Sequence, residues 1–417
     1  MKDMRKIIAS IDIGSNFIKL VVGEIFKNRV QILAASQTPS LGISKGFVVE
    51  PQPLISKLEE AFQKCENILG VKISKVFLGV PSENSEFFLA DGSTTITSED
   101  HVIRNTDIVR AMQACTYNRI DNDREIVSIK PTSYYIDEGE SIKNPIGVEA
   151  SKLTVKCLVA TVPRKNAYTL VKCLEQIGVQ VVDFTLGTIG DYFEFQKEMM
   201  KDNVGVFVNL GYSKTEISIF NKGLLTNCET LELGSKNIEQ DLSYIFKVPL
   251  KDAKDIKMTL AAAHNRGVSA SIKKKYTTKT GEEIVVSEYE ATEVASSRLS
   301  EILKIVKKEI NHLTKKEIHY IMITGGVSEM TNFSSLLEEV FGRSAKVGVT
   351  KELGVRSNVY STSVGLLKYY EDKFRNRNQE FSVFSEEEIK DMCTIDKKIS
   401  FGENSILGKL FGYFFDN

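Results

Sequence analysis

Two short polar turns hold the residues of this chain whose types and spacing are suited to binding an anion. The first turn contains Asp12, Gly14, Ser15 and Asn16, and Lys19 follows shortly after it. Glycine lets a backbone approach a phosphate closely because it has no Cβ. The N–H groups of such a turn form a cradle for anionic oxygens, Ser15 and Asn16 add side-chain donors, and Lys19 adds a point charge. This turn therefore predicts a phosphate site.

Asp12 adds metal chemistry to this prediction. Mg²⁺ prefers one or two carboxylates and keeps several of its waters, so Asp12 is the candidate to hold a Mg²⁺-bound water. A single turn of this kind also fits an ordinary β-turn between two strands. The first turn by itself leaves both interpretations open.

A second turn repeats the first at a constant spacing of 197 residues, so that Asn209 and Gly211 correspond to Asp12 and Gly14. Each turn lies between runs rich in β-branched residues, which predict a strand before and after it. Repetition at this distance predicts two similar lobes that each begin with a β-hairpin. The second turn supplies the candidate residues Asn209, Gly211, Tyr212, Ser213 and Lys214.

A third glycine-containing segment follows a strand predicted over residues 320–323. Glycines between this strand and a helix expected to begin near Asn332 would let an adenosine lie close to the chain. Loops between strands and helices also carry glycine for purely structural reasons. The informative feature is the combination of a duplicated hairpin with a later strand–Gly–Gly–helix segment. The candidate residues here are Gly325, Gly326 and Val327.

Composition excludes several classes of protein. A chain of 417 residues predicts two to four domains. Its net charge of −1 argues against a nucleic-acid partner, which would leave a basic excess. No apolar run approaches the roughly 20 residues that a membrane-spanning helix needs. The six cysteines and four histidines are dispersed, without a C-x-x-C pair, and predict neither a disulfide framework nor a zinc site.

Apolar periodicity predicts the main helices. They are expected over residues 53–69, 166–177, 235–246, 297–313 and 361–370. The tract of Lys273, Lys274 and Lys275 is expected to form a solvated loop. Residues 371–404 are rich in charge and lack sustained periodicity, which predicts a flexible linker.

The duplicated hairpin with the glycine pair resembles the superfamily of actin, heat-shock chaperones and sugar kinases. Within that superfamily the chain resembles the FtsA family of bacterial cell-division proteins. Residues 142–148, followed by Lys152 and Leu153, are similar to the N-P-x-G-M segment of that family's extra subdomain. Residues 233–238, 241–242, 249–257 and 358–367 also follow the family's pattern. The resemblance covers roughly residues 7–370 and the C-terminal tip.

This resemblance implies an α/β fold: a two-lobed actin-like ATPase with duplicated ribonuclease-H-like domains, an inserted subdomain in each lobe, and a C-terminal amphipathic helix. The core of the first lobe would comprise residues 1–82 and 161–200, with 361–370 packing on it and 83–160 as its inserted α+β subdomain. The core of the second lobe would comprise residues 201–227 and 299–360, with 228–298 as its insertion. Residues 371–404 would be the linker and 405–417 the amphipathic helix.

The resemblance also implies ATP and Mg²⁺ as ligands, and it adds Gly234, Ser235 and Lys257 to the nucleotide site. The family's second turn usually reads D-I-G-G-G-T, whereas here Asn209 replaces the acid. An amide cannot act as a general base, and Tyr212 crowds the backbone cradle. We therefore expect ATP binding with at most weak hydrolysis. Weakened or lost nucleotide binding is the alternative.

Residues 405–417 combine helical periodicity with an apolar face, and Asn404 or Ser405 can cap the helix. Such a segment is typical of a helix that lies in the membrane interface, or of a tail that docks in a protein groove. The resemblance favours the membrane, because the FtsA family carries an amphipathic anchor at this place. The residues expected to contact lipid are Ile406, Leu407, Lys409, Leu410, Phe411, Phe414 and Phe415.

The function implied by the resemblance is that of a membrane-tethering adaptor in bacterial cell division. It would bind ATP, self-associate into actin-like polymers, and anchor filaments of the tubulin-like protein FtsZ at the division site, on the cytoplasmic face of the membrane. The second-lobe insertion would capture the C-terminal tail of FtsZ. One alternative is a cytosolic scaffold of the pilus-assembly type, for which no membrane-binding tip is expected. Another is a sugar kinase or phosphatase of the same fold, for which Asn209 leaves the second turn without an acidic base.

Overall fold

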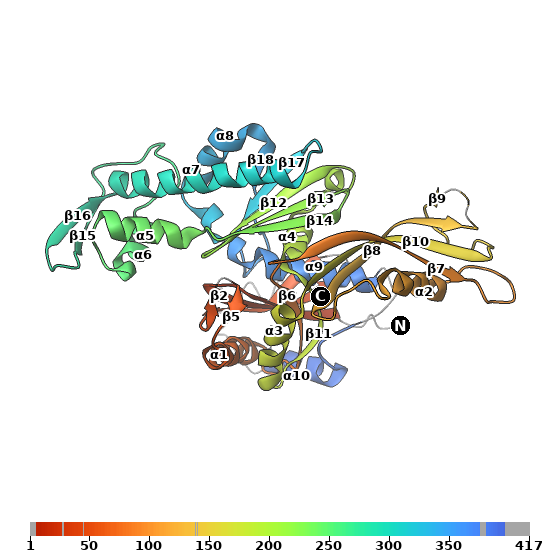
Figure 1. Ribbon diagram of the computed structural model, residues 1–417. Helices are drawn as coiled ribbons and strands as arrows, with labels where there is room; N and C mark the ends of the chain where they lie inside the picture. Colours follow the sequence, from red (N-terminus) through yellow and green to blue (C-terminus); the bar gives the residue numbers. More distant parts are fainter. Residues whose placement is uncertain are drawn as a thin grey trace.

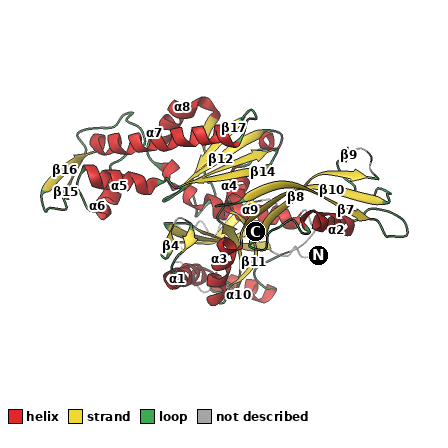
Figure 2. Cartoon of the chain, viewed as in Figure 1, coloured by secondary structure: helices red, strands yellow, loops and turns green. Residues whose placement is uncertain are grey.

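The computed structural model describes residues 6–26, 29–44, 46–137, 139, 141–375 and 381–396 of the 417 in the chain. These residues form two lobes, each built on a five-stranded sheet. Figures 1 and 2 show a smaller sheet extending from the first lobe at one end of the molecule. An arm that ends in a short β-hairpin extends from the second lobe at the other end.

The sheet of the first lobe has the order β11-β6-β1-β2-β3. Strands β1, β2 and β3 are antiparallel, whereas β6 and β11 run parallel to β1. Helices α1 and α3 pack on each other and on this sheet, and α4 and α9 form a second packed pair on it. The elements are β1 (Lys6–Ile13), β2 (Phe17–Phe26), β3 (Arg29–Pro39), β4 (Ile43–Ser44), β5 (Phe47–Val48), α1 (Pro51–Leu69), β6 (Lys75–Val80), α3 (Arg164–Gln176), β11 (Gln180–Leu186), α4 (Gly187–Phe195) and α9 (Ser361–Arg375).

The sheet of the second lobe has the order β14-β13-β12-β17-β18, which is the order of the first sheet read from its β3 edge. Helices α7 and α8 pack together beside it. The elements are β12 (Val204–Leu210), β13 (Thr215–Asn221), β14 (Leu224–Leu231), α7 (Glu288–Leu313), β17 (Tyr320–Thr324), α8 (Phe333–Phe341) and β18 (Ala345–Val347).

The register of the two hairpins confirms the repeat predicted from the sequence. Asp12 pairs with Lys19 across β1 and β2, and Asn209 pairs with Glu216 across β12 and β13. Both pairs keep the spacing of 197 residues. In each lobe a further strand joins the first strand of the hairpin in parallel, β6 in one and β17 in the other. The two lobes therefore present equivalent turns at equivalent edges of their sheets.

Each lobe carries an insertion. The first is a four-stranded sheet of order β7-β10-β8-β9 with one helix against it. Its elements are β7 (Glu86–Thr95), α2 (Asn105–Thr116), β8 (Arg124–Ile136), β9 (Ser141–Ile142) and β10 (Lys152–Pro163). The second insertion packs two helices against α7 and ends in a hairpin. Its elements are α5 (Ser235–Ile245), α6 (Leu250–Thr259), β15 (Lys273–Thr277) and β16 (Glu283–Ser287).

The structure differs from the sequence prediction at two places in the second insertion. Lys273, Lys274 and Lys275 are exposed, as expected, but they form strand β15 rather than a loop, because β16 supplies hydrogen-bonding partners. Helix α7 begins at Glu288, nine residues before the predicted start. The Ser287 side chain accepts from the Glu290 N–H, and Glu290 accepts from the Ser287 N–H in return. This capping box sets the start of the helix, whose first turns bury the small residues Ala291 and Ala295.

The prediction of a flexible linker over 371–404 is wrong for its described residues. Helix α9 continues to Arg375, and a further helix, α10 (Glu386–Asp396), follows. Val383 and Phe384 are buried, and the Val383 N–H donates to the Ile7 carbonyl over 2.9 Å. The Phe381 ring stacks on Phe374 with 4.9 Å between centroids. A few aromatic and aliphatic residues therefore fix a segment whose average composition is polar.

The amphipathic helix predicted over 405–417 lies outside the described residues. Within the described ranges, no helix has both the length and the apolar character that a bilayer crossing requires.

Helices α4 and α9 cross at two glycines. A Cβ on Gly365 would lie 1.7 Å from the Gly190 carbonyl oxygen, and one on Gly190 would lie 2.4 Å from the Thr362 carbonyl oxygen. The two backbones are therefore in direct contact, and a methyl group at either position would force them apart. The chain enters the second lobe directly after α4 and leaves it directly before α9, so this crossing joins the two lobes.

We expect Gly190→Ala to lower the melting temperature by about 1–3 °C, because the added methyl meets backbone that cannot rotate away. Gly187→Ala, in the same helix, is the matched control. A Cβ there would lie 3.3 Å from a methyl of Thr362 and 3.8 Å from the nearest backbone atom, and alanine favours the helix. Thermal unfolding followed by circular dichroism compares the two variants. Equal melting temperatures would contradict a backbone contact at Gly190.

Candidate functional site

The first hairpin turn is closed by its own backbone. The Gly14 N–H donates to the Phe17 carbonyl over 3.0 Å, and Lys19 Nζ lies 2.5 Å from Asp12 Oδ2. Both side chains are largely enclosed, with 11% of Lys19 and 21% of Asp12 exposed. The predicted metal ligand and the predicted phosphate-binding cation are thus adjacent, and each balances the charge of the other.

The second hairpin turn has the same backbone geometry. The Gly211 N–H donates to the Lys214 carbonyl over 3.0 Å, which matches the bond between Gly14 and Phe17. The carbonyls of this turn are used as well, because the Ser235 N–H donates to Gly211 and the Lys236 N–H donates to Tyr212. These N–H groups belong to the first turn of α5, so the loop itself occupies donors that could otherwise face an anion.

Gly325 joins the third predicted segment to the second hairpin. Strand β17 pairs with β12 in parallel, so that Thr324 lies opposite Asn209. Gly325 has φ +88°, and a Cβ there would lie 2.4 Å from the Leu210 carbonyl oxygen. Gly326 and Val327 begin the short 3₁₀ helix η2 (Gly326–Glu329). The two segments predicted independently in the second lobe are therefore neighbours in space.

Two family profiles match the chain. One, described as "Cell division protein FtsA", matches residues 206–365, and the other, "SHS2 domain inserted in FTSA", matches residues 84–161. The chain belongs to the FtsA family of cell-division proteins. The resemblance inferred from the turns and the motifs is thereby confirmed.

Relatives in several bacteria agree with this assignment. The chain is 26% identical to the cell division protein FtsA of Bacillus subtilis, over 86% of this chain and 82% of that protein. It is 23% identical to FtsA of Escherichia coli, over 90% and 93%. It is 25% identical to FtsA of Borreliella burgdorferi, over 98% of both chains.

Solved structures confirm the predicted actin-like fold. MreB5 of Spiroplasma citri bound to ADP matches with a TM-score of 0.58 at 11% identity, over 89% of this chain and 98% of that one. The PilM–PilN type IV pilus biogenesis complex matches with a TM-score of 0.56 at 14% identity, over 87% and 97%. At these identities the likeness concerns the fold alone.

A buried carboxylate that the sequence analysis missed lies beside the second turn of this FtsA-family protein. The Asn209 amide donates to Asp191 Oδ2 over 2.7 Å, and the Ser361 and Thr362 hydroxyls donate to Asp191 Oδ1 over 2.7 and 3.0 Å. Burial raises the pKa of Asp191 to about 6, although its three hydrogen-bond donors oppose that shift. The one signal in the sequence is an aspartate within the otherwise uncharged stretch 187–193.

The first turn of α9 joins both hairpins to this carboxylate. The Ser363 hydroxyl donates to the Lys19 carbonyl over 3.1 Å, and the Ser10 hydroxyl donates to the Ser363 carbonyl over 2.7 Å. On the other side, the Asn209 amide of the second hairpin donates to the Thr362 hydroxyl over 3.5 Å, and Thr324 of β17 donates to the Ser361 hydroxyl over 3.0 Å. The two hairpins therefore converge on one helix terminus, where the junction of the lobes fixes their positions.

Tyr212 and Lys257, which were predicted separately, meet on Glu239. The Tyr212 hydroxyl donates to one Glu239 oxygen over 2.9 Å, and Lys257 Nζ lies 2.5 Å from the other. Lys257 also lies 3.4 Å from Ser235 Oγ. Burial and the Glu239 charge raise the pKa of Tyr212 to about 12, so the phenol remains a donor at neutral pH. The side chain that replaces a family glycine is thus held against α5 and α6.

The described residues do not bring three or more acidic, histidine or cysteine side chains into a metal-binding cluster. Asp12 by itself suits Mg²⁺ that is held through water, since this ion needs few protein ligands. Asp12 therefore suits Mg²⁺ only when a second ligand supplies phosphate oxygens to the same ion.

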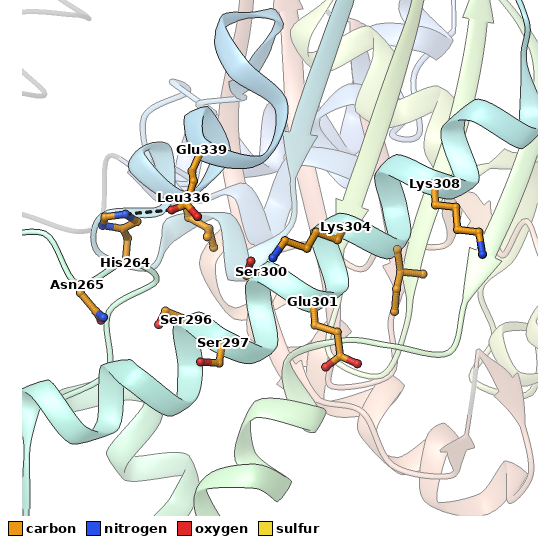
Figure 3. Close-up of a pocket in the computed structure, with 11 residues that line it drawn as sticks. His264, Asn265, Ser296, Ser297, Ser300, Glu301, Lys304, Lys308, Leu336 and Glu339 are labelled. Atoms are coloured by element: carbon orange, nitrogen blue, oxygen red, sulfur yellow. Dashed lines mark ion pairs between the residues drawn. The ribbon is translucent and has the colours of Figure 1, made fainter.

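A separate surface groove of about 730 Å³ lies on the second lobe. Figure 3 shows it between α7 and the segment that holds His264, with Leu336 and Glu339 of α8 at its edge. His264 Nε2 lies 3.3 Å from Glu339 Oε2. None of the residues predicted to bind nucleotide lines this groove, so it is a distinct surface.

The burial of Asp191 predicts a specific dependence of stability on pH. Its pKa of about 6 in the folded chain lies above the ordinary value of 3.8. Between these pH values the folded state holds a proton that the unfolded state has lost, so stability falls as pH rises through that window, by about 1.4 kcal/mol per unit. We expect the stability of the Asp191→Asn variant to lack this dependence on pH.

Urea unfolding of both proteins between pH 4.5 and 7.5 checks this expectation. The stability of the native protein relative to Asp191→Asn should shrink as pH rises to about 6 and then stay constant. A difference that stays constant over the whole range would show that Asp191 titrates normally in the folded state.

Proposed function

We propose that the protein acts as a membrane-tethering adaptor in cell division, and that it binds ATP with Mg²⁺ between its two hairpins. The observation that carries the proposal is the convergence of the duplicated hairpins on α9 in a chain of the FtsA family. Self-association into actin-like polymers is part of the proposal and is supported by the family membership.

The nucleotide proposal assigns the phosphates to the two turns. Gly14 and Lys19 would hold them from the first lobe, and Gly211 from the second, while Gly325 and Lys257 would adjoin the nucleoside. MreB5 of Spiroplasma citri, which shares the fold, has been solved bound to ADP and bound to AMPPNP. Mg²⁺ would screen the phosphate charge while Asp12 holds one of its waters.

Several contacts favour slow or absent hydrolysis. Asn209 offers no basic oxygen, and its amide already donates to Asp191. Asp191 is buried and accepts hydrogen bonds from three side chains, which leaves it poorly placed to activate a water. The turn carbonyls occupy N–H groups at the start of α5. We therefore propose that nucleotide serves as a structural ligand rather than as a rapidly turned-over substrate.

Membrane attachment is assigned to residues 405–417, whose apolar side chains would enter the lipid interface. Full burial of a large apolar side chain contributes about 1.5–3 kcal/mol, and ordering of the helix offsets much of the sum. A single tip should therefore bind weakly and reversibly. Joining many copies in a polymer would raise the effective concentration of tips at the surface.

Co-flotation with anionic liposomes tests the attachment. We expect the full-length chain to float and a chain ending at Gly402 to stay in solution, with a further rise for the full-length chain when Mg-ATP is present. The truncation leaves every described residue intact, including α10. If both chains stay in solution, the tip is no anchor, and a protein groove becomes its expected binding site.

The same experiment separates the scaffold alternative. The PilM–PilN complex shows that the fold also serves in pilus biogenesis. Flotation of the full-length chain alone would contradict the scaffold alternative, for which no membrane-binding tip is expected. Equal flotation of both chains would contradict the tip as the anchor.

The groove of Figure 3 is proposed as the docking place of the FtsZ tail. It lies where the second insertion joins the lobe, and the exposed side chains of Lys304 and Lys308 on α7 line it. Glu301 and Glu339 line it as well, so the concave surface has mixed charge and suits an extended peptide whose charged groups pair with either sign.

We expect the double variant Lys304→Glu/Lys308→Glu to weaken binding of the FtsZ tail peptide at least about fivefold. The change removes both lysines from a lining that already holds Glu301 and Glu339, and so makes the groove strongly acidic. Lys165→Glu, at an exposed site of α3 in the first lobe, is the control. Fluorescence anisotropy of a labelled tail peptide gives the affinities. Equal affinities for the two variants would show that the tail peptide binds to another surface of the protein.

A further inference from the structure

Two polar contacts connect the second hairpin to the first lobe, away from the helix crossing. Lys214 Nζ pairs with Glu83 Oε1. The Ser82 hydroxyl donates to Glu216 Oε2 over 2.5 Å. Lys214 and Glu216 stand on either side of the first residue of β13, whereas Ser82 and Glu83 lie two and three residues beyond the end of β6. The contacts therefore join two segments that face each other across the lobes.

These charges are poorly exposed to solvent. The exposed fraction of the side chain is 19% for Lys214 and 11% for Glu83. Burial raises the pKa of Glu216 to about 7, which Lys214 and Ser82 oppose. An ion pair shielded in this way is screened less by salt than a surface pair, and removal of one partner leaves the other charge uncompensated.

A third segment covers the pair. Gly46, between β4 and β5, has φ +85°, and a Cβ there would lie 2.6 Å from Glu83 Oε1 and 2.8 Å from Lys214 Nζ. The next residue, Phe47, lines a cavity of about 240 Å³ together with Ser82, Glu83 and Lys214. The turn between β4 and β5 thus lies over the contact. The positive φ favours glycine at position 46, and a side chain there would also displace the charged ends of Glu83 and Lys214.

Lys214 departs from the family's usual second turn, as do Asn209 and Tyr212. We infer that Lys214, Glu83, Glu216 and Ser82 form a clasp that holds the two lobes together and needs no bound nucleotide to do so. In a two-lobed protein a ligand that contacts both lobes favours the closed arrangement. Here the polypeptide supplies such a bridge from its own side chains.

The residues that depart from the family's second turn are also the ones that fix this turn in place. Tyr212 fixes the turn to α5 and α6 through Glu239, and Lys214 fixes it to the first lobe. Asn209 joins it to Asp191 beneath. The turn is thus held on three sides by protein contacts. The inference does not depend on nucleotide binding and would stand if the protein bound none.

Hydrogen–deuterium exchange of the full chain without nucleotide tests the clasp. We expect Lys214→Met and Glu83→Gln each to speed exchange about tenfold in two segments at once, residues 81–86 of the first lobe and 211–217 of the second. Gly46→Ala should have the same effect, because its methyl enters the pair. The exchanged pair Lys214→Glu/Glu83→Lys should restore most of the protection.

Lys201→Met is the matched control, since Lys201 pairs only locally with Glu198, at 2.9 Å. Unchanged exchange in α7 verifies that each variant is folded. Exchange in the Lys214→Met variant that equals the native rate in both segments would overturn the clasp. So would loosening confined to residues 211–217, because Lys214 would then stabilise only its own turn.

Discussion

The backbone contact between Gly190 and Gly365 is the constraint on which the rest of the molecule depends. It brings α4 and α9 so close that the first turn of α9 reaches strands of both lobes. Hydroxyls at that turn then hydrogen-bond to the first hairpin, to β17 and to the carboxylate beneath the second hairpin. Larger side chains at the crossing would separate the helices and move both turns of the candidate site.

Burial of carboxylates along the junction of the lobes follows from this close approach. Burial raises the pKa of Asp191 to about 6, of Glu216 to about 7 and of Glu194 to about 8. Glu194 lies 2.8 Å from Lys368 Nζ, which also pairs with Glu352 at 2.5 Å. Unpaired charges would be expensive in such places, so hydroxyls, amides and ammonium groups surround each carboxylate. An aromatic cluster crosses the same junction, where Tyr192 of α4 stacks on Phe220 of β13 with 4.4 Å between ring centroids. Polar and aromatic contacts together therefore fix how the lobes meet.

The C-terminal segment is positioned by a different interaction. Phe77 of β6 stacks on Tyr370 with 4.0 Å between ring centroids and meets Phe381 edge-on at 5.3 Å. The hydrogen bond from Val383 to Ile7 then places this segment beside β1. Aromatic pairs add to the stabilisation that their buried area provides. The sequence that follows, including the proposed membrane tip, consequently starts from a fixed place on the first lobe.

The amino-acid sequence alone predicts the duplicated lobes, the two turns and the glycine pair, because hairpins and strand periodicity depend on residues close in the chain. It also determined the main helices to within a few residues where apolar periodicity marks them. Contacts between residues far apart in the chain could be identified only from the three-dimensional structure. Asp191 meets Asn209, Lys214 meets Glu83, and Phe381 meets Phe77 only after strands distant in sequence are aligned. Val383 and Phe384 are buried for the same reason, since burial depends on a surface that the rest of the chain supplies.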